Sequence, residues 1–264
     1  MKNEKILINI ENISDIDYYK KIGINNFLFA INDFSIGYKT FDINEIKHIK
    51  ENKYLLINRI LNNEDCEKFK EIKKELEYID GIIFEDIAIY NILKDFKINL
   101  IWNQTHFATN YKSINHWLEL THSAVISNEL TSNELKEILN NTNKPLILNI
   151  FGKNPIMYSR RTLITNFNKN FNLSDNKEVI LKEPITNNEF LATENNFGTF
   201  IFNNKYFNII PYLKDFDDEK ILFYLINPCG LEKEEINELI NGELLENSDD
   251  GFMNKKTIYK LRGE

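Results

Sequence analysis

Three stretches between residues 103 and 161 decide the fold that the sequence predicts: NQTHFATN (103–110), AVISNELTSNEL (124–135) and NIFGKNPIMYSRR (149–161). Each lies at the end of a short apolar run, and the runs are Leu100–Trp102, Ala124–Ile126 and Leu146–Phe151. Segments with helical spacing separate these runs. Short apolar runs that alternate with helices are typical of βαβ units, in which the strands are parallel.

The same alternation extends along most of the 264-residue chain. Eight apolar runs of strand length occur, at residues 6–10, 26–31, 54–60, 81–84, 98–102, 123–126, 145–151 and 220–226. Helices are predicted between them, including one over residues 42–52 and one over 131–142 that opens with a capping box. Residues 153–211 lose this rhythm and show hairpin-like alternation, with Gly198 at a turn or bulge.

Eight βα units of this length predict an α/β fold of the (β/α)8 TIM-barrel type. The expected organisation is one barrel domain over residues 1–264, with a β-hairpin-rich insertion between strands 7 and 8. A doubly wound sheet ranks second, because it would need fewer strands or a second domain.

Composition limits the classes of function. The net charge of -8 argues against a surface that is basic overall and coats nucleic acid, although a local basic face is compatible with it. The two cysteines, Cys66 and Cys229, are far apart and form no disulfide framework. The first apolar run is too short for a signal peptide, and no run reaches the length of a membrane span. We therefore expect a soluble cytoplasmic protein.

Polar residues gather where the predicted strands end, which in a barrel of this type is the functional face. This set consists of Asn58, Arg59, Glu85, Asp86, Asn103, Gln104, His106, Ser127, Glu129 and Asn227. Together they could bind a small polar ligand. They could equally cap the helices that follow, as Asp86 and Ser127 often do at such positions.

His106 is the candidate for acid-base chemistry, because among the four histidines it alone follows a strand end and stands among amides. Glu85 and Glu129 are the carboxylates that would act with it. The alternative for His106 is a hydrogen bond that holds its loop. The three residues could also converge on a metal, but no local spacing of ligands demands one, and we predict none.

A basic segment follows the seventh strand. Residues 153–182 include six basic residues and only two acidic ones. The basic residues are Lys153, Arg160, Arg161, Lys169, Lys177 and Lys182. The tail adds Lys255, Lys256, Lys260 and Arg262. Such groups contact phosphates, and the interleaved Tyr158, Phe167 and Phe171 could stack on bases. The alternative is a solvated rim whose arginine pair bridges to acidic residues at the strand ends.

Four segments in this order resemble peptidase family U32, the collagenase-like peptidases: SNELTSNELKEI (127–138), FGKNPIMYSRR (151–161), ENNFGTFIFNNKYFNII (194–210) and GFMNKKTIYKLRG (251–263). Within this family, the chain is most similar to the smaller of two paired proteins linked to tRNA hydroxylation at wobble uridine. This similarity rests on its short length and on HFATN (106–110), which follows WNQ (102–104). The resemblance implies an accessory or substrate-presenting subunit, with tRNA and a larger cysteine-bearing U32 paralogue as partners.

The chain departs from that family in two ways. Members with defined chemistry carry several cysteines in and around the insertion, which hold an iron-sulfur cluster, whereas no cysteine lies between Cys66 and Cys229 here. We therefore expect no cofactor. The sequence also lacks recognisable peptidase motifs such as HExxH or G-x-S-x-G. A peptidase for unfolded or collagen-like chains remains one alternative, and a binding module for a small carboxylate that uses Arg59 or Arg160 is another.

Overall fold

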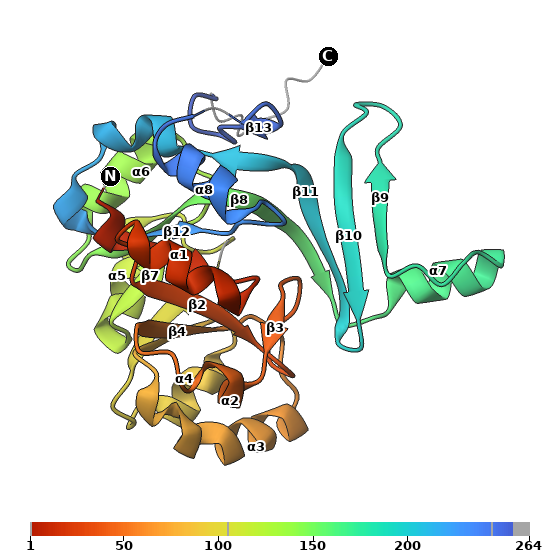
Figure 1. The fold of residues 1–264 in the computed structure, drawn as a ribbon, viewed down its shortest axis with the longest axis horizontal. Helices are drawn as coiled ribbons and strands as arrows, with labels where there is room; N and C mark the ends of the chain where they lie inside the picture. The colour runs from red at the N-terminus through yellow and green to blue at the C-terminus, as the bar shows by residue number, and fades with distance from the viewer. Residues whose placement is uncertain (1, 105, 244, 256–264) are drawn as a thin grey trace.

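Eight parallel strands form a closed barrel in the computed structural model, which describes residues 2–104, 106–243 and 245–255 (Figure 1). The barrel strands are β1 (Ile6–Asn9), β2 (Asn26–Ile31), β4 (Asn52–Ile57), β5 (Gly81–Phe84), β6 (Asn99–Asn103), β7 (Ser123–Val125), β8 (Leu146–Ser159) and β12 (Ile221–Ile226). Neighbours in this order pair in parallel, and β12 closes the ring by pairing with both β8 and β1. The predicted (β/α)8 barrel is confirmed.

Helices cover the outside of the barrel: α1 (Ile16–Lys21), α2 (Ile43–Ile46), α3 (Asn63–Ile72), α4 (Ile87–Leu93), α5 (Tyr111–Leu120), α6 (Ser132–Asn141) and α8 (Lys233–Ile240). The predicted capping box of α6 is present, because the Thr131 side chain accepts from Glu134 N–H and the Glu134 carboxylate accepts from Thr131 N–H. Two 3-10 segments, Ile210–Asp215 and Asp218–Lys220, occupy the connection that leads into β12. No helix of the described part is both long and apolar enough to cross a bilayer.

The helix predicted over residues 42–52 is wrong in extent, since α2 ends at Ile46. Its predicted C-terminal half belongs to the approach to β4, which begins at Asn52. Asn52 Nδ2 donates to Asn26 Oδ1 at 2.8 Å, and these two residues are also paired in the β2–β4 register. This pairing holds the chain extended where periodicity alone predicts another helical turn.

Side chains alternate along each barrel strand between the interior and the helices. In β4, Leu56 belongs to the cluster inside the barrel, whereas Leu55 and Ile57 pack in the larger cluster under the helices. All three are buried. This period of two matters for the site, because residues that continue it beyond a strand end point into the barrel mouth.

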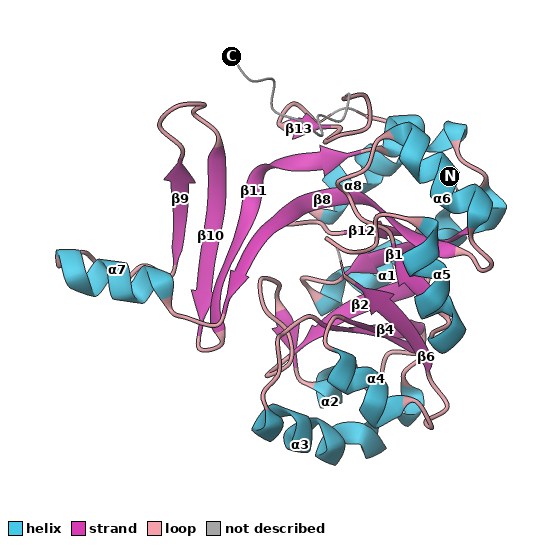
Figure 2. Ribbon diagram, turned by 180° about the vertical axis from the view of Figure 1, so that it is seen from behind, coloured by secondary structure: helices cyan, strands magenta, loops and turns pink. Residues whose placement is uncertain are grey.

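The insertion forms a projecting arm, which we define as residues 153–208. In it, β8 continues beyond the barrel and pairs antiparallel with β11 (Gly198–Asn208), followed by β10 (Glu189–Asn195) and β9 (Glu178–Lys182). The helix α7 (Leu163–Phe171) lies at the base of β9, and the arm extends sideways from the barrel (Figures 1 and 2). A two-residue strand, β13 (Ser248–Asp249), pairs with β11, and β3 (Thr40–Phe41) pairs with β2.

The sequence analysis did not predict α7, and a buried carboxylate explains its start. Glu194 of β10 accepts hydrogen bonds from the backbone N–H of Ile164 at 2.8 Å and of Thr165 at 3.1 Å. These are N–H groups of the first helical turn, which an N-cap side chain normally satisfies. Because the cap comes from a distant strand, the local sequence carries no signal for it.

The arm contacts the barrel through the loop that follows β2. Ile36 packs with Phe200 and Phe202 of β11 in a separate buried cluster. Gly37 has a φ of +82°, and a Cβ on it would lie 2.9 Å from both of those rings. Asn58, after β4, fixes the loop by accepting from Ile36 N–H and donating to Ile36 O. The start of the arm is thus attached over the barrel mouth.

Candidate functional site

A layer of polar side chains lines the barrel mouth at the carboxyl ends of the strands. Each continues the inward alternation of its strand, as Glu85 does two residues after the interior Ile83. The layer consists of Asn58, Glu85, Asn103, Asn149 and Asn227. Aliphatic interior residues lie below it, and Tyr38, Pro155 and Phe200 border it on the side of the arm. The mouth is therefore a polar layer between two apolar ones.

Glu85 is the titratable group of this layer. Partial burial of this carboxyl raises its pKa to about 8. Asn103 Nδ2 donates to Glu85 Oε1 at 3.3 Å, and Gln104 Nε2 donates to the backbone carbonyl of Glu85 at 2.9 Å. These two contacts bring Glu85, Asn103 and Gln104 together at the strand ends. At neutral pH the carboxyl is largely protonated and can donate an O–H hydrogen bond.

Three amide oxygens near the mouth are buried without a hydrogen-bond donor among the described residues. They are Oδ1 of Asn9, Asn103 and Asn149. A buried acceptor without a partner costs about 1–3 kcal/mol. A ligand that brings N–H or O–H groups into the mouth would satisfy the acceptors of Asn103 and Asn149, which line it. The mouth therefore suits a neutral ligand that has both donors and acceptors.

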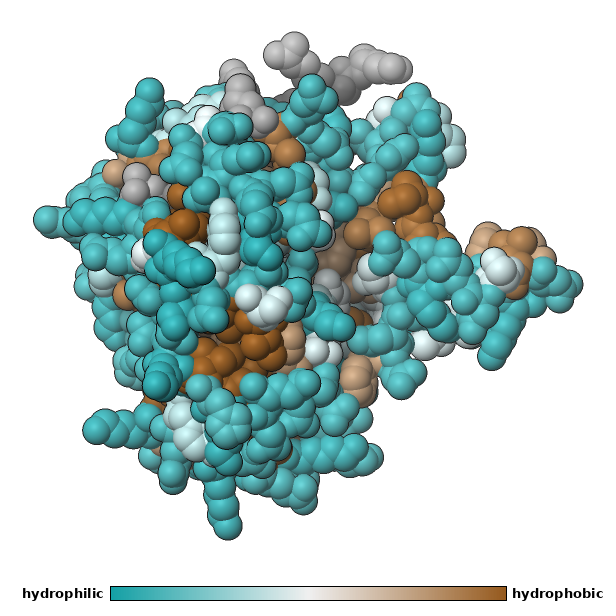
Figure 3. All heavy atoms as spheres, in the orientation of Figure 1, coloured by the Kyte–Doolittle hydropathy of each residue, from teal (hydrophilic) through white to brown (hydrophobic). Residues whose placement is uncertain are grey.

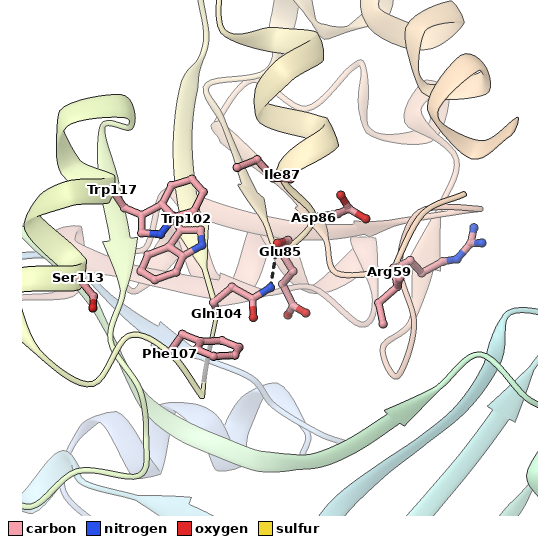
Figure 4. A pocket seen from close by; sticks show the side chains of 10 residues that line it. Arg59, Glu85, Asp86, Ile87, Trp102, Gln104, Phe107, Ser113 and Trp117 are labelled. Atoms are coloured by element: carbon pink, nitrogen blue, oxygen red, sulfur yellow. Dashed lines mark hydrogen bonds between the residues drawn. The ribbon is translucent and has the colours of Figure 1, made fainter. Parts of the chain in front are cut away.

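An open cavity of about 590 Å³ lies beside the mouth and shares Glu85 with it. Aromatic residues form one wall: the rings of Trp102 and Trp117 stack with centroids 4.8 Å apart, and Phe107 is exposed next to them (Figure 4). Gln104 lies between this wall and Glu85 in the same view. A flat ring entering from solvent would meet aromatic faces before it reached Glu85.

Arg59 is buried, although the sequence predicted it as a substrate-binding residue. Its Nη2 pairs with Asp65 Oδ2 at 3.1 Å, and its guanidinium carbon lies 3.7 Å from the centre of the Phe197 ring. Nε and Nη1 are buried with no hydrogen-bond partner in the described part of the chain. Arg59 thus joins helix α3 to the turn between β10 and β11, and its side chain also borders the open cavity.

His106 and Glu129 contact each other outside the mouth. His106 Nδ1 lies 3.2 Å from Glu129 Oε1, and both side chains are about half exposed. They line a third cavity together with Ser127, Asn128 and Lys255. Glu85 does not line this cavity, so the structure separates it from the other two predicted catalytic residues. Ser127 Oγ accepts from Glu129 N–H at 3.1 Å in the loop before α6, whose N-cap is Thr131, so Ser127 does not cap a helix, whereas Asp86 caps α4 by accepting from Ala88 N–H.

Tyr158, Arg160 and Arg161 lie where β8 ends in the arm. The Tyr158 hydroxyl donates to the Phe197 carbonyl at 3.2 Å. Burial raises the pKa of this hydroxyl, and the nearby positive charges of Arg59 and Arg160 oppose that rise. Arg160 and Arg161 are exposed, and no carboxylate of the described residues lies within ion-pair distance of either. Their predicted alternative, bridges to acidic strand-end residues, is therefore not formed in the described chain.

The remaining predicted basic residues differ in their surroundings. Lys177 pairs with Asp175 and Glu194, and Lys153 Nζ donates to Asn204 Oδ1 at 3.2 Å. Lys169 and Lys182 are exposed. Lys256, Lys260 and Arg262 lie outside the described residues. Among the described residues of this basic segment, the exposed groups without an ion pair are thus Arg160, Arg161, Lys169 and Lys182.

The sequence analysis missed Asn9, Asn149 and the Trp102–Trp117 wall. Asn149 interrupts the apolar run LILNIF (146–151), and Asn9 interrupts ILINI (6–10). Asn149 lies two residues after Ile147, and Asn9 lies two residues after Leu7. Both Ile147 and Leu7 point into the barrel, so the two asparagines are also at inward positions of their strands. A polar residue at an inward position of a buried strand was the signal that could have identified both.

The sequence profile of peptidase family U32 matches residues 29–228, which is most of the chain and spans β2 to the end of β12. The chain belongs to peptidase family U32. The matched range contains every predicted site residue, including those of the arm. No curated protein matches the chain.

Solved structures match this U32 protein only at low identity and low TM-score. The N-terminal domain of a proposed aldolase from Bacteroides vulgatus matches with a TM-score of 0.41 and 15% identity, over 56% of this chain and 64% of that one. A chitinase from Chromobacterium violaceum ATCC 12472 gives 0.43 and 8%, over 90% and 98%. The spore cortex-lytic enzyme SleL from Bacillus megaterium QM B1551 gives 0.41 and 9%, over 96% and 74%. These likenesses concern the fold alone.

The residues of this U32 protein do not fit the iron-sulfur cluster that the resemblance implies for other members. Cys229 is free, its Sγ accepts from Lys153 N–H at 3.3 Å, and burial raises the pKa of its thiol to about 12. Cys66 lies on α3, where burial also raises the pKa of the thiol. Cluster ligation requires thiolates. The described residues contain no group of three or more His, Cys, Asp or Glu side chains arranged to hold a metal ion.

Proposed function

We propose that this U32 protein is an accessory, substrate-presenting subunit in tRNA wobble-uridine hydroxylation, acting with a larger U32 paralogue that carries the cysteines. The observation that carries the proposal is the position of Arg160 and Arg161. They are exposed and unpaired among the described residues, at the end of a strand that starts inside the barrel and runs out along the arm. The arm thus presents positive charge beside the mouth of a protein whose net charge is negative.

The arginines are suited to the RNA backbone. A guanidinium group binds phosphate through paired N–H donors, and such contacts position an RNA without reading its sequence. Tyr158 lies near Arg59 and Arg160, and its hydroxyl donates to the carbonyl of Phe197, whose ring covers Arg59 beside the open cavity next to the mouth. An RNA strand held by Arg160 and Arg161 would therefore pass close to the mouth.

The mouth itself holds only about 40 Å³ of free space, so a neutral base would occupy the open cavity of about 590 Å³ and reach the mouth with one edge, at Glu85, which lines both. A uracil edge offers one N–H donor between two carbonyl acceptors. Asn103 Oδ1 is a buried acceptor without a donor among the described residues, and the protonated Glu85 carboxyl can donate to a carbonyl. Proteins that take a base out of its stack hold it by such hydrogen bonds and by aromatic contacts. The exposed Phe107, beside the partly exposed Trp117 and the buried Trp102, provides aromatic surface at the entrance.

Mass spectrometry of tRNA nucleosides from a deletion strain tests the proposal. We expect the hydroxylated wobble uridine to be lost on deletion and restored by the wild-type gene. An Arg160→Ala/Arg161→Ala gene should restore it poorly. The matched control is Lys94→Ala/Lys97→Ala, which removes two exposed charges at the opposite end of the barrel, before β6.

Unchanged wobble nucleosides in the deletion strain would reject the proposal. Cleavage of denatured protein or gelatin by the purified chain, lost in Glu85→Gln, would support the peptidase alternative instead. If the arginine double variant fully restored the modified nucleoside, the protein would still act in tRNA modification, but Arg160 and Arg161 would not be needed for it.

A further inference from the structure

The strand β9 ends the sheet of the arm with an open edge. It pairs with β10 on one side, and no other strand of the described residues pairs with it. Ile180 is 53% exposed and Leu181 is 41% exposed. An apolar strand with an unpaired edge is a template for another strand, and proteins usually cover or block such edges.

The hydrogen bonds to β10 define which backbone groups face the open edge. Glu194 N–H donates to Lys177 O, and Glu183 N–H donates to Asn188 O. In an antiparallel ladder the bonded residues alternate, so residues 177, 179, 181 and 183 bond to β10. The backbone groups of Glu178, Ile180 and Lys182 therefore point outward. Of these, the Glu178 N–H is held locally by Asn176 Oδ1 at 3.2 Å.

The sequence of β9, Glu-Val-Ile-Leu-Lys, is complementary to itself in the antiparallel direction. Within β9, only a pairing centred on Ile180 places Glu178 of one copy opposite Lys182 of the other, and it does so twice. In that register the three outward-facing residues form the hydrogen-bonded pairs of the new ladder. Opposite charges directly across a strand pair stabilise it, and like charges destabilise it.

A second apolar surface lies next to this edge. Leu163, Phe167, Leu173, Val179 and Leu181 border a groove between α7 and the sheet. Phe167 and Leu173 are both more than half exposed. In both views α7 projects beyond β9, and Figure 3 shows apolar side chains exposed on the arm. A strand added to β9 would lie over this overhanging helix and cover its apolar side chains.

We propose that this protein forms a symmetric homodimer in which the β9 strands of two copies pair antiparallel about Ile180, producing one continuous sheet across both arms. The groove under α7 receives the Val179 and Leu181 face of the partner strand. This interface needs no RNA and no paralogue, so it is independent of the proposed function.

Charge exchange across the two-fold axis tests the register. The full chain should sediment as a dimer at micromolar concentration. Glu178→Lys alone and Lys182→Glu alone each place like charges opposite one another twice, and each should weaken dimerisation about tenfold or more. The double variant Glu178→Lys/Lys182→Glu restores opposite charges and should dimerise like the wild type.

Mixing the two single variants gives the sharpest result. A Glu178→Lys chain and a Lys182→Glu chain carry opposite charges at both facing positions, so the mixture should form a heterodimer more tightly than either variant forms a homodimer. Ile180→Pro should give a folded monomer, because proline is tolerated on an edge strand where its missing N–H faced outward. Circular dichroism checks that each variant is folded.

Three outcomes would overturn the homodimer. The first is a wild-type chain that stays monomeric up to about 100 µM, which is far above the dissociation constants of stable complexes. The others are a dimer that neither single charge variant weakens, and single variants that form no heterodimer on mixing. A chain that is monomeric alone and binds only a different protein falls under the first outcome.

Discussion

The guanidinium carbon of Arg59 lies 3.7 Å from the centre of the Phe197 ring, and this contact links the loop after β4 to the turn between β10 and β11. Arg59 is buried and paired with Asp65 on the opposite side. A cation over an aromatic face is stabilised further when both are removed from water. This contact and the packing of Ile36 on Phe200 are two places where the arm is held to the barrel.

Replacing Phe197 by Leu tests the energy of that link. The change keeps an apolar side chain but removes the aromatic face, and we expect a loss of about 1–2 kcal/mol in the free energy of unfolding. Urea titration followed by circular dichroism measures it. The control is Phe107→Leu, because Phe107 is 68% exposed and should change stability by less than about 0.5 kcal/mol. Equal small effects for both variants would show that the Arg59 contact contributes little.

Glu85 should make the protein less stable as the pH rises. The folded-state pKa is raised to about 8 from an ordinary value of 4.5, so the folded state binds the extra proton between these values. The contribution of Glu85 to the unfolding free energy is fully present below about pH 4.5, and it is lost as the pH rises through about 8. Within this window the slope of the unfolding free energy is at most roughly -1.4 kcal/mol per pH unit.

Glu85→Gln removes the titration while keeping a group that can accept from Asn103 Nδ2. Unfolding free energies measured by urea titration from pH 5 to 9, about the span of the window, should fall with pH in the wild type and less steeply in the variant. Identical slopes in wild type and Glu85→Gln would contradict the raised pKa.

The sequence predicts the barrel well because its signals are local. Each barrel strand is a short apolar run, and the helices between them begin at side chains such as Thr131 that cap them. The same period of two identifies Glu85 and Asn103 as inward residues, and it would have identified Asn149. What could not be predicted depends on distant contacts: the cap that Glu194 gives α7, and the burial of Arg59 under Phe197.

The cofactor prediction follows from the two cysteines. Protein purified without oxygen should be colourless and contain substoichiometric iron, because cluster ligation needs thiolates and burial keeps the Cys229 thiol protonated. Because the pKa of the Cys229 thiol is raised to about 12, iodoacetamide at about pH 8 should label Cys66 faster than Cys229 in the native state. A reproducible brown colour, with about four iron and four sulfide ions per chain, would contradict the prediction.

The arginines of the arm should govern the salt dependence of RNA binding. If Arg160 and Arg161 contact phosphates, changing both to Ala should weaken binding about equally for unrelated RNA sequences, since phosphate contacts position without reading bases. Each lost contact should flatten the slope of log K against log salt by roughly 0.7 to 0.9. The variant should stay folded, because exposed arginines seldom contribute more than about 1 kcal/mol.

Filter binding or fluorescence anisotropy at several salt concentrations measures both the RNA affinity and the slope of log K against log salt. The variant Lys94→Ala/Lys97→Ala controls for the loss of two positive charges from the whole protein. A distant charge pair changes the long-range field only slightly at physiological salt, where the screening length is about 8 Å. The control should therefore keep the wild-type slope. An unchanged RNA affinity and slope in the folded arginine variant would show that RNA does not bind this surface. An unfolded variant would instead show that the two arginines are needed to fold the arm.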